Sequence, residues 1–90
     1  MDNTSESIKD LLIDKNESVT VVSVLDNCTK ELDVLIDKVK LTPQLYNQRE
    51  KLLTEVSDKT YKELDSKVSD TLWLKINLIG FVYQYFYEKL

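Results

Sequence analysis

Histidine is absent from this 90-residue sequence, and cysteine, glycine, proline and arginine each occur only once. Without histidine the chain lacks the side chain that most often serves as a general base or a metal ligand. A single glycine excludes a glycine-rich loop that could hold a phosphate group. We therefore predict no catalytic residue, no metal site and no cofactor, and we expect that the protein is not an enzyme.

The single cysteine, Cys28, has no second cysteine with which to form a disulfide in the chain. The absence of disulfides is typical of proteins in reducing compartments, so we expect an intracellular, cytoplasmic protein. The opening residues MDNTSESIKD contain no basic region followed by an apolar run. No secretory signal is therefore predicted there.

Basic residues are too few and too scattered to form a positively charged patch. The formal net charge is -4, and residues 1–42 carry nine acidic residues against five lysines. Binding of nucleic acid without sequence preference depends on clustered lysine and arginine. Nucleic acid is therefore not an expected partner.

The overall composition favours long helices. Hydrophobic residues make up 42% of the chain and charged residues 31%, with very little glycine or proline to interrupt an element. A chain of this length suffices for one domain with one core. We predict an all-α fold over residues 1–90, either an antiparallel helical hairpin or a three-helix bundle with coiled-coil-like packing.

The clearest periodic signal lies between residues 17 and 40. Apolar residues there are spaced alternately by four and three, as in the a and d positions of a coiled coil. These residues are Val21, Leu25, Cys28, Leu32, Leu35 and Val39. Pro43 disfavours helical geometry at Thr42 and is itself favoured at the first helical position. One helix should therefore end near Leu41, and the next should begin with Thr42 as its N-cap.

Residues 1–5 are predicted to be disordered, and helices are predicted at about residues 6–14, 17–40, 43–57 and 60–89. The boundary between the last two helices has two solutions. Ser57 and Thr60 both favour helix ends, and Thr60 forms a capping box with Glu63, which predicts a break at this point. The alternative is one continuous helix from Pro43 to about Glu88.

A β-sheet is the alternative to the helical fold. The segments VTVVSV and INLIGFVYQYFY are rich in β-branched and aromatic residues, which strands favour. However, the heptad spacing begins inside the first segment, and no turn residues bound the second. Both observations favour helices.

The C-terminal stretch is the most apolar part of the chain, with 13 apolar or aromatic residues among the 19 from Leu72 to Leu90. At about 100° per residue it forms a helix that is apolar on two opposite faces. The face expected to pack on the rest of the chain consists of Leu72, Ile76, Ile79, Tyr83, Phe86 and Leu90. The residues predicted to be exposed and to bind a partner are Trp73, Leu74, Leu78, Phe81 and Tyr85.

The two-faced helix leads to three hypotheses about function. The leading one is a non-enzymatic protein–protein interaction module, either a small helical subunit of a larger complex or a self-associating bundle. Its partner is another protein or a second copy of the chain. The alternative is a small monomeric helical inhibitor or immunity-type regulator that acts on a target protein, with the acidic N-terminal half as an electrostatic contact. The third is attachment to a membrane surface, which the scarcity of basic residues disfavours.

Overall fold

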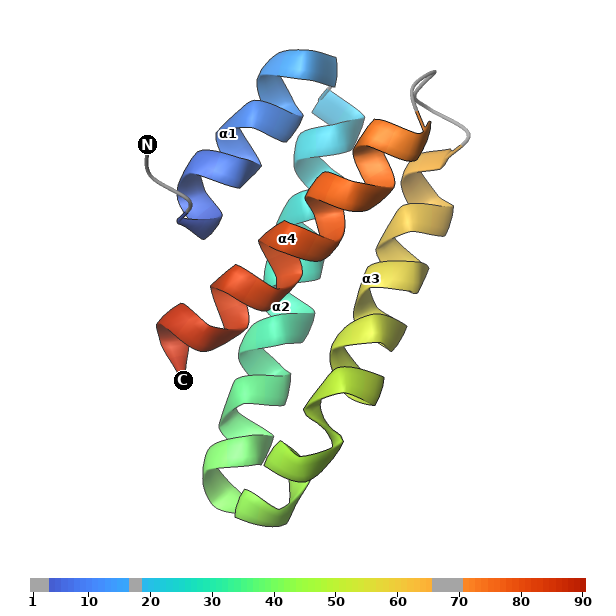
Figure 1. Cartoon of the computed structure of the whole chain (residues 1–90). Helices are drawn as coiled ribbons and strands as arrows, with labels where there is room; N and C mark the ends of the chain where they lie inside the picture. The colour runs from blue at the N-terminus through green and yellow to red at the C-terminus, as the bar shows by residue number, and fades with distance from the viewer. Residues whose placement is uncertain (1–3, 17–18, 66–70) are drawn as a thin grey trace.

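The structure of the chain is a computed structural model that describes residues 4–16, 19–65 and 71–90. In chain order its elements are α1 (Ser5–Asn16), α2 (Val19–Leu41), the 3-10 helix η1 (Pro43–Gln48), α3 (Arg49–Asp65) and α4 (Thr71–Lys89) (Figure 1). The described residues contain no strand, and the two segments with strand-like composition lie within α2 and α4. The predicted all-α fold is confirmed.

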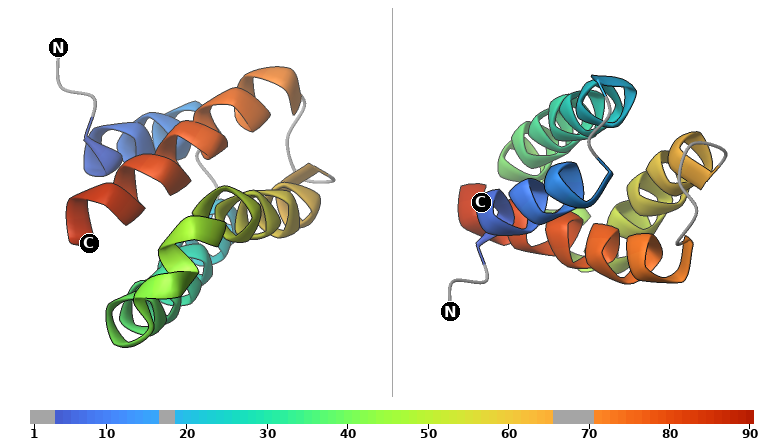
Figure 2. Two further views of the ribbon diagram at one scale, coloured as in Figure 1. Left: turned by 60° about the horizontal axis from the view of Figure 1, so that its bottom comes forward. Right: turned by 90° about the horizontal axis from the view of Figure 1, so that it is seen from above.

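α2 and α3 form a long antiparallel hairpin, and α4 lies over one side of it (Figure 1). Each of α1, α2 and α3 packs against α4. The view from above shows α1 beside α4, on the side away from α3 (Figure 2). The short N-terminal helix is therefore a full member of the bundle, which over the described residues contains four packed α-helices.

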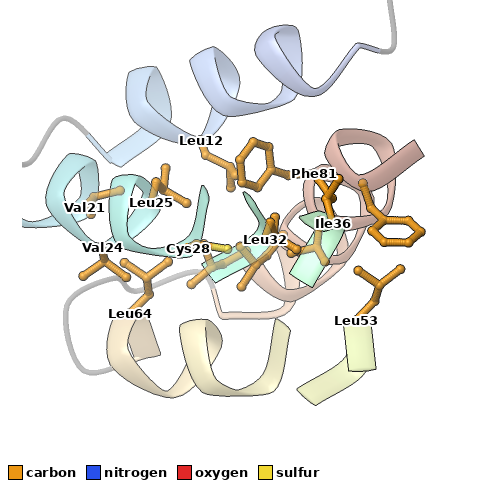
Figure 3. Close-up of a cluster of buried hydrophobic side chains, with 14 of the residues drawn as sticks. Leu12, Val21, Val24, Leu25, Cys28, Leu32, Ile36, Leu53, Leu64 and Phe81 are labelled. Carbon is orange, nitrogen blue, oxygen red and sulfur yellow. The ribbon is translucent and has the colours of Figure 1, made fainter. Parts of the chain in front are cut away.

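α2 contributes the longest row of core side chains (Figure 3). Five of the six predicted heptad positions are buried, and Leu35 is partly exposed. Val24 and Ile36, which lie outside the heptad row, are also buried. The buried arc is wider than the seam of a two-stranded coiled coil because α2 packs against α3 as well as against α1 and α4.

The turn between α2 and α3 is set by Pro43. α2 ends at Leu41, as the proline predicts, and the Thr42 N–H still donates to the Lys38 carbonyl at 2.8 Å. Pro43 then begins η1, where its fixed φ and its missing N–H suit the first helical position. Thr42 occupies the predicted N-cap position, but its side chain makes no capping hydrogen bond.

The predicted break at Ser57 and Thr60 is wrong, because α3 continues through both residues. Both side chains are only 3% exposed and lie in the buried row between Leu53 and Leu64. Tertiary packing here overrides the preference of serine and threonine for helix ends. The alternative of one helix over residues 43–88 is also wrong, because α3 and α4 are separate helices that pack against each other.

The two buried hydroxyls of α3 differ in their partners. The Thr60 side chain hydrogen-bonds to the thiol of Cys28 on α2, and this bond offsets part of the effect of burial on the thiol. Burial nevertheless raises the pKa of Cys28 to about 11, so the thiol is a neutral core group rather than a reactive nucleophile. The Ser57 hydroxyl is buried with no hydrogen-bond partner among the described residues.

We expect the substitution Ser57→Ala to stabilise the protein. It removes a buried, unpaired hydroxyl and introduces the residue with the highest helix propensity, so the free energy of unfolding should rise by about 1 kcal/mol. Urea denaturation followed by circular dichroism measures this change. The matched control Thr60→Ala removes a paired hydroxyl and should lower the free energy of unfolding; stabilisation by both substitutions, or by neither, would contradict this account.

Candidate interaction surface

The face of α4 that we predicted from the sequence to be exposed lies against the rest of the bundle. The side chains of Leu74, Leu78 and Phe81 are fully buried, and Tyr85 is partly buried. The prediction that this face is exposed is therefore wrong. The side chain of Trp73, the fifth residue of the predicted binding face, lies outside the described residues.

A polar contact to α2 accompanies the burial of this face. Apolar periodicity cannot choose between two apolar faces. The inner face also carries the phenol of Tyr85, which donates a hydrogen bond of 2.6 Å to the Asp33 carboxylate on α2. Burial and this neighbouring carboxylate raise the pKa of Tyr85 to about 12. The polar tip of the inner face therefore keeps a hydrogen-bond partner on the hairpin when the face is buried.

The opposite side of α4 forms an exposed apolar row that runs along the helix. We define the α4 outer stripe as Leu72, Ile76, Ile79, Tyr83 and Tyr87. Their spacing of four, three, four and four residues places them on one side of the helix. Leu72 is 71% exposed, Ile76 62% and Ile79 40%, and Tyr87 is also exposed. Tyr83 is partly buried and packs against the core.

One member of the expected inward face is indeed buried. Phe86 lies in the core, whereas Leu72, Ile76 and Ile79 are exposed. The Phe86 ring packs edge-on against the ring of Tyr87, with 5.4 Å between the ring centroids. The boundary between core and surface on α4 therefore runs between these two aromatic rings.

The C-terminal end of the α4 outer stripe is joined to the start of α3 by an arginine. The Arg49 Nε donates to the Tyr87 hydroxyl at 2.9 Å, and its guanidinium lies 4.2 Å from the centroid of the Tyr46 ring. The Tyr83 and Tyr87 rings are 6.5 Å apart. Tyrosine and arginine are the residue types most enriched, together with tryptophan, at the energetic centres of protein interfaces.

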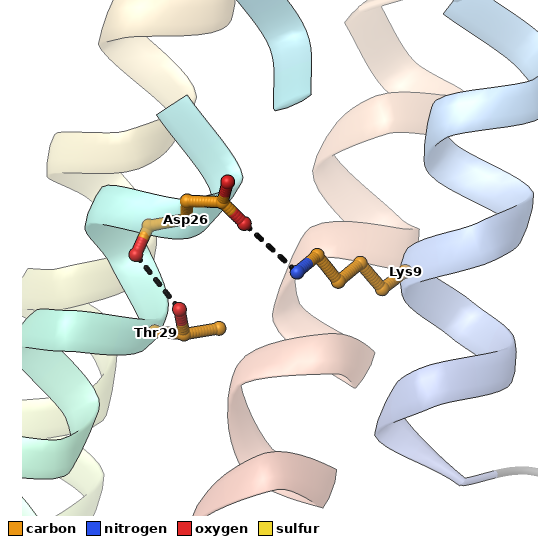
Figure 4. Close-up of polar contacts among 3 residues, drawn as sticks. All are labelled: Lys9, Asp26 and Thr29. Carbon is orange, nitrogen blue, oxygen red and sulfur yellow. Dashed lines mark hydrogen bonds and ion pairs between the residues drawn. The ribbon is translucent and has the colours of Figure 1, made fainter. Parts of the chain in front are cut away.

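α1 is held beside α4 by contacts at its two sides. On the hairpin side, Lys9 forms an ion pair of 2.9 Å with Asp26 of α2 (Figure 4). On the other side, the backbone N–H and the hydroxyl of Ser5 both donate to the carboxylate of Glu88. These bonds hold the pKa of Glu88 below its usual range. Ser5 is therefore ordered and buried as the first residue of α1, which corrects the predicted disorder at that position; residues 1–3 of that prediction lie outside the described residues.

Glu88 acts as an N-cap for α1 that is supplied by another helix. Since its pKa is lower in the folded protein than in the unfolded chain, its carboxylate stabilises the fold above the usual glutamate pKa of about 4.3, and this contribution is lost as the pH falls through the lowered value. We expect Glu88→Gln to speed amide hydrogen exchange in α1 at about pH 7 and to have little effect at about pH 2.5. The matched control Glu55→Gln, on α3, should leave α1 exchange unchanged. An equal effect of Glu88→Gln at both pH values would show that the charge plays no part.

Gly80 lies where α4 meets α1, but the packing does not require a glycine there. A Cβ atom at this position would lie 3.8 Å from Ile8 Cδ1, which is an ordinary van der Waals distance. Glycine in a helix interior costs about 1 kcal/mol relative to alanine. We therefore expect Gly80→Ala to raise the free energy of unfolding by about that amount, measured by thermal or urea denaturation. Destabilisation would show that α1 approaches α4 more closely than the structure indicates.

Among the hollows on the described surface, two lie between packed helices, and both are small. One, of about 180 Å³, lies between α2 and α3 beside the ion pair of Lys59 and Glu31. The other, of about 100 Å³, lies between α1 and α4 near Glu88. Among the residues that the structure describes, no group of three or more cysteine, aspartate and glutamate side chains is arranged to hold a metal ion. The α4 outer stripe is the more extended feature.

Comparison of the chain with protein-family models, with curated proteins and with solved structures gives no match. Within the described ranges, none of the helices has the length and apolar character needed to cross a membrane.

Proposed function

We propose that the chain is a non-enzymatic protein–protein interaction module and that its α4 outer stripe is the binding surface. One observation carries this proposal: Leu72, Ile76, Ile79 and Tyr87 of this stripe stay exposed although the other face of the same helix fills the core. Burying one such side chain is worth about 1.5 to 3 kcal/mol. A contiguous exposed apolar surface of this kind marks an interaction site in soluble proteins.

The composition of the surface supports the same proposal. Its N-terminal half is aliphatic, with Leu72 and Ile76, and its C-terminal half combines Tyr83 and Tyr87 with the guanidinium of Arg49. An apolar centre with tyrosine and arginine beside it is the usual anatomy of a protein interface. Cys28, a buried free thiol, is compatible with the reducing cytoplasm that we propose as the compartment.

Site-specific photocrosslinking tests the proposed surface. A photoreactive phenylalanine analogue at position 76 should give covalent adducts with another protein chain in the native cell. The matched control position is Val34, which is 54% exposed in the middle of α2. Adducts from position 76 that disappear when Leu72→Asp is added, with none from position 34, are the expected result. Equal adducts from both positions, or none from position 76, would contradict the proposal.

A further inference from the structure

α1 contributes the smallest share of the described core. Leu12 is the only apolar side chain of α1 that is buried, whereas α2, α3 and α4 supply every other buried apolar side chain of the described residues. Ile8 and Ile13 are only partly buried, and Leu11 is 49% exposed. Burial of apolar surface is the main source of stability in a fold, so α1 is the helix that burial holds least strongly.

The polar contacts of α1 add little to its attachment. The side chains of the Lys9–Asp26 ion pair are 27% and 52% exposed, and exposed ion pairs contribute little free energy. The bonds from Ser5 end on the carboxylate of Glu88, which is an exposed residue. These contacts therefore set the position of α1 more than they raise its stability.

The other three α-helices form a closed unit without α1. α2, α3 and α4 all pack against one another, whereas α1 packs only against α2 and α4 within the described residues. The 12 residues of α1 are too few for a stable isolated helix. Undocking of α1 therefore unfolds α1 itself and leaves a three-helix unit that keeps its own core.

α1 covers a strip of surface on α4 and α2. Leu12 lies beside Phe81 of α4 (Figure 3). Ile8 Cδ1 lies 3.8 Å from the position that a Cβ atom of Gly80 would occupy. We define the α1 groove as the surface beneath and beside α1 that consists of Gly80, Phe81 and Glu88 of α4 with Asp26 and Thr29 of α2. It combines an apolar strip with a carboxylate on each of the two helices.

This groove is complementary to an amphipathic helix that carries a cation. α1 places Ile8 and Leu12, which are four residues apart, against the apolar strip. The N–H groups at the start of a helix carry a partial positive charge, and the first N–H of α1 meets the Glu88 carboxylate. Lys9 meets the carboxylate of Asp26. The pattern that fits the groove is therefore Ser-x-x-Ile-Lys-x-x-Leu, as in residues 5–12.

We propose that α1 is a detachable cover, which leaves as a unit while α2, α3 and α4 stay folded, and that the uncovered α1 groove accepts a helix of the same pattern from another protein. α1 then acts as an intramolecular inhibitor of the groove, because the two helices compete for one surface. The α4 outer stripe is open while α1 is docked, so this inference does not rest on the proposed function.

Native-state hydrogen exchange tests the opening of α1. The helical amides of α1 should exchange through openings at least about 100-fold more frequent than the openings that release the amides of α2. Low concentrations of urea should accelerate α1 exchange only slightly, because a local opening exposes little surface. Exchange of α1 only together with α2, at one common rate of opening, overturns the proposal.

The substitution Leu12→Asp tests whether the rest of the bundle is independent of α1. We expect the NMR chemical shifts of α1 to become those of an unfolded segment, while α2, α3 and α4 keep helical shifts. The matched control Leu11→Asp introduces the same charge at the neighbouring exposed position and should leave α1 docked. Loss of structure throughout the Leu12→Asp chain overturns the proposal, as does an α1 that stays docked in it.

A synthetic peptide of residues 4–16 is the probe for the α1 groove. Gly80 is the only glycine in the chain, so its amide NMR signal is easily identified and reports on the groove. About 1 mM peptide should shift this signal in the Leu12→Asp protein. The shift should be at least about fivefold smaller in the unchanged protein, where the tethered α1 competes at a high effective concentration.

A control peptide with Leu12→Asp should leave the Gly80 signal of the Leu12→Asp protein unchanged. Equal shifts from the two peptides, or none from the native peptide, overturn the groove as an acceptor of helices. Vesicles of phosphatidylglycerol should also leave the signal unchanged, because the groove carries carboxylates; a shift as large as that from the peptide would overturn the proposal in favour of a lipid surface. None of these measurements involves position 76, so the photocrosslinking result tests the proposed function separately.

Discussion

The fold depends on the burial of the inner face of α4 against the α2–α3 hairpin. Leu74, Leu78 and Phe81 fill the space over the hairpin, and α4 is the helix against which α1, α2 and α3 all pack. α1, with 12 residues, is shorter than an isolated helix needs to be for stability in water. Its structure therefore depends on its contacts with the other helices. Without the inner face of α4, the hairpin would keep an open apolar side and α1 would have little surface to pack on.

Apolar burial drives this packing, and polar contacts join the helices at the edges of the core. Each pair of helices in contact across the bundle is joined by at least one polar contact among the described residues. These contacts are Lys9–Asp26, Ser5–Glu88, Tyr85–Asp33, Lys59–Glu31 and Arg49–Tyr87. Such exposed contacts contribute little free energy individually. If α4 were rotated by half a turn it would still bury a row of apolar side chains, but Tyr85 and Glu88 would lose their partners.

Much of the fold could be predicted from the sequence because several signals are local. The heptad spacing identified the buried side of α2, and Pro43 identified where that helix ends. The continuation of α3 through Ser57 and Thr60 could not be predicted, because it depends on Cys28 and the rest of the α2 surface that covers them. Local preference and tertiary packing conflict at these two residues, and packing decides the outcome.

Most residues of the candidate surface could be recognised in the sequence as one row, but the sequence did not show that this row faces outward. Leu72, Ile76, Ile79 and Tyr83 form a recognisable row in the sequence, yet the row opposite to it has the same apolar character. The partner of Tyr85 that breaks this symmetry, Asp33, is 52 residues away along the chain. Periodicity describes one helix at a time, so it contains no information about a contact between α4 and α2. The role of Arg49 beside Tyr87 could not be found for the same reason.

The contact between Ser5 and Glu88 joins residues that are 83 positions apart in the chain. During synthesis, α1 is made before α4, which supplies most of the surface on which α1 docks. The heptad helix and its hairpin partner can form as soon as they are translated, whereas α1 must wait as a marginal helix until α4 has been made. Completion of this bundle therefore follows the synthesis of α4, and until then the apolar side of the hairpin stays uncovered.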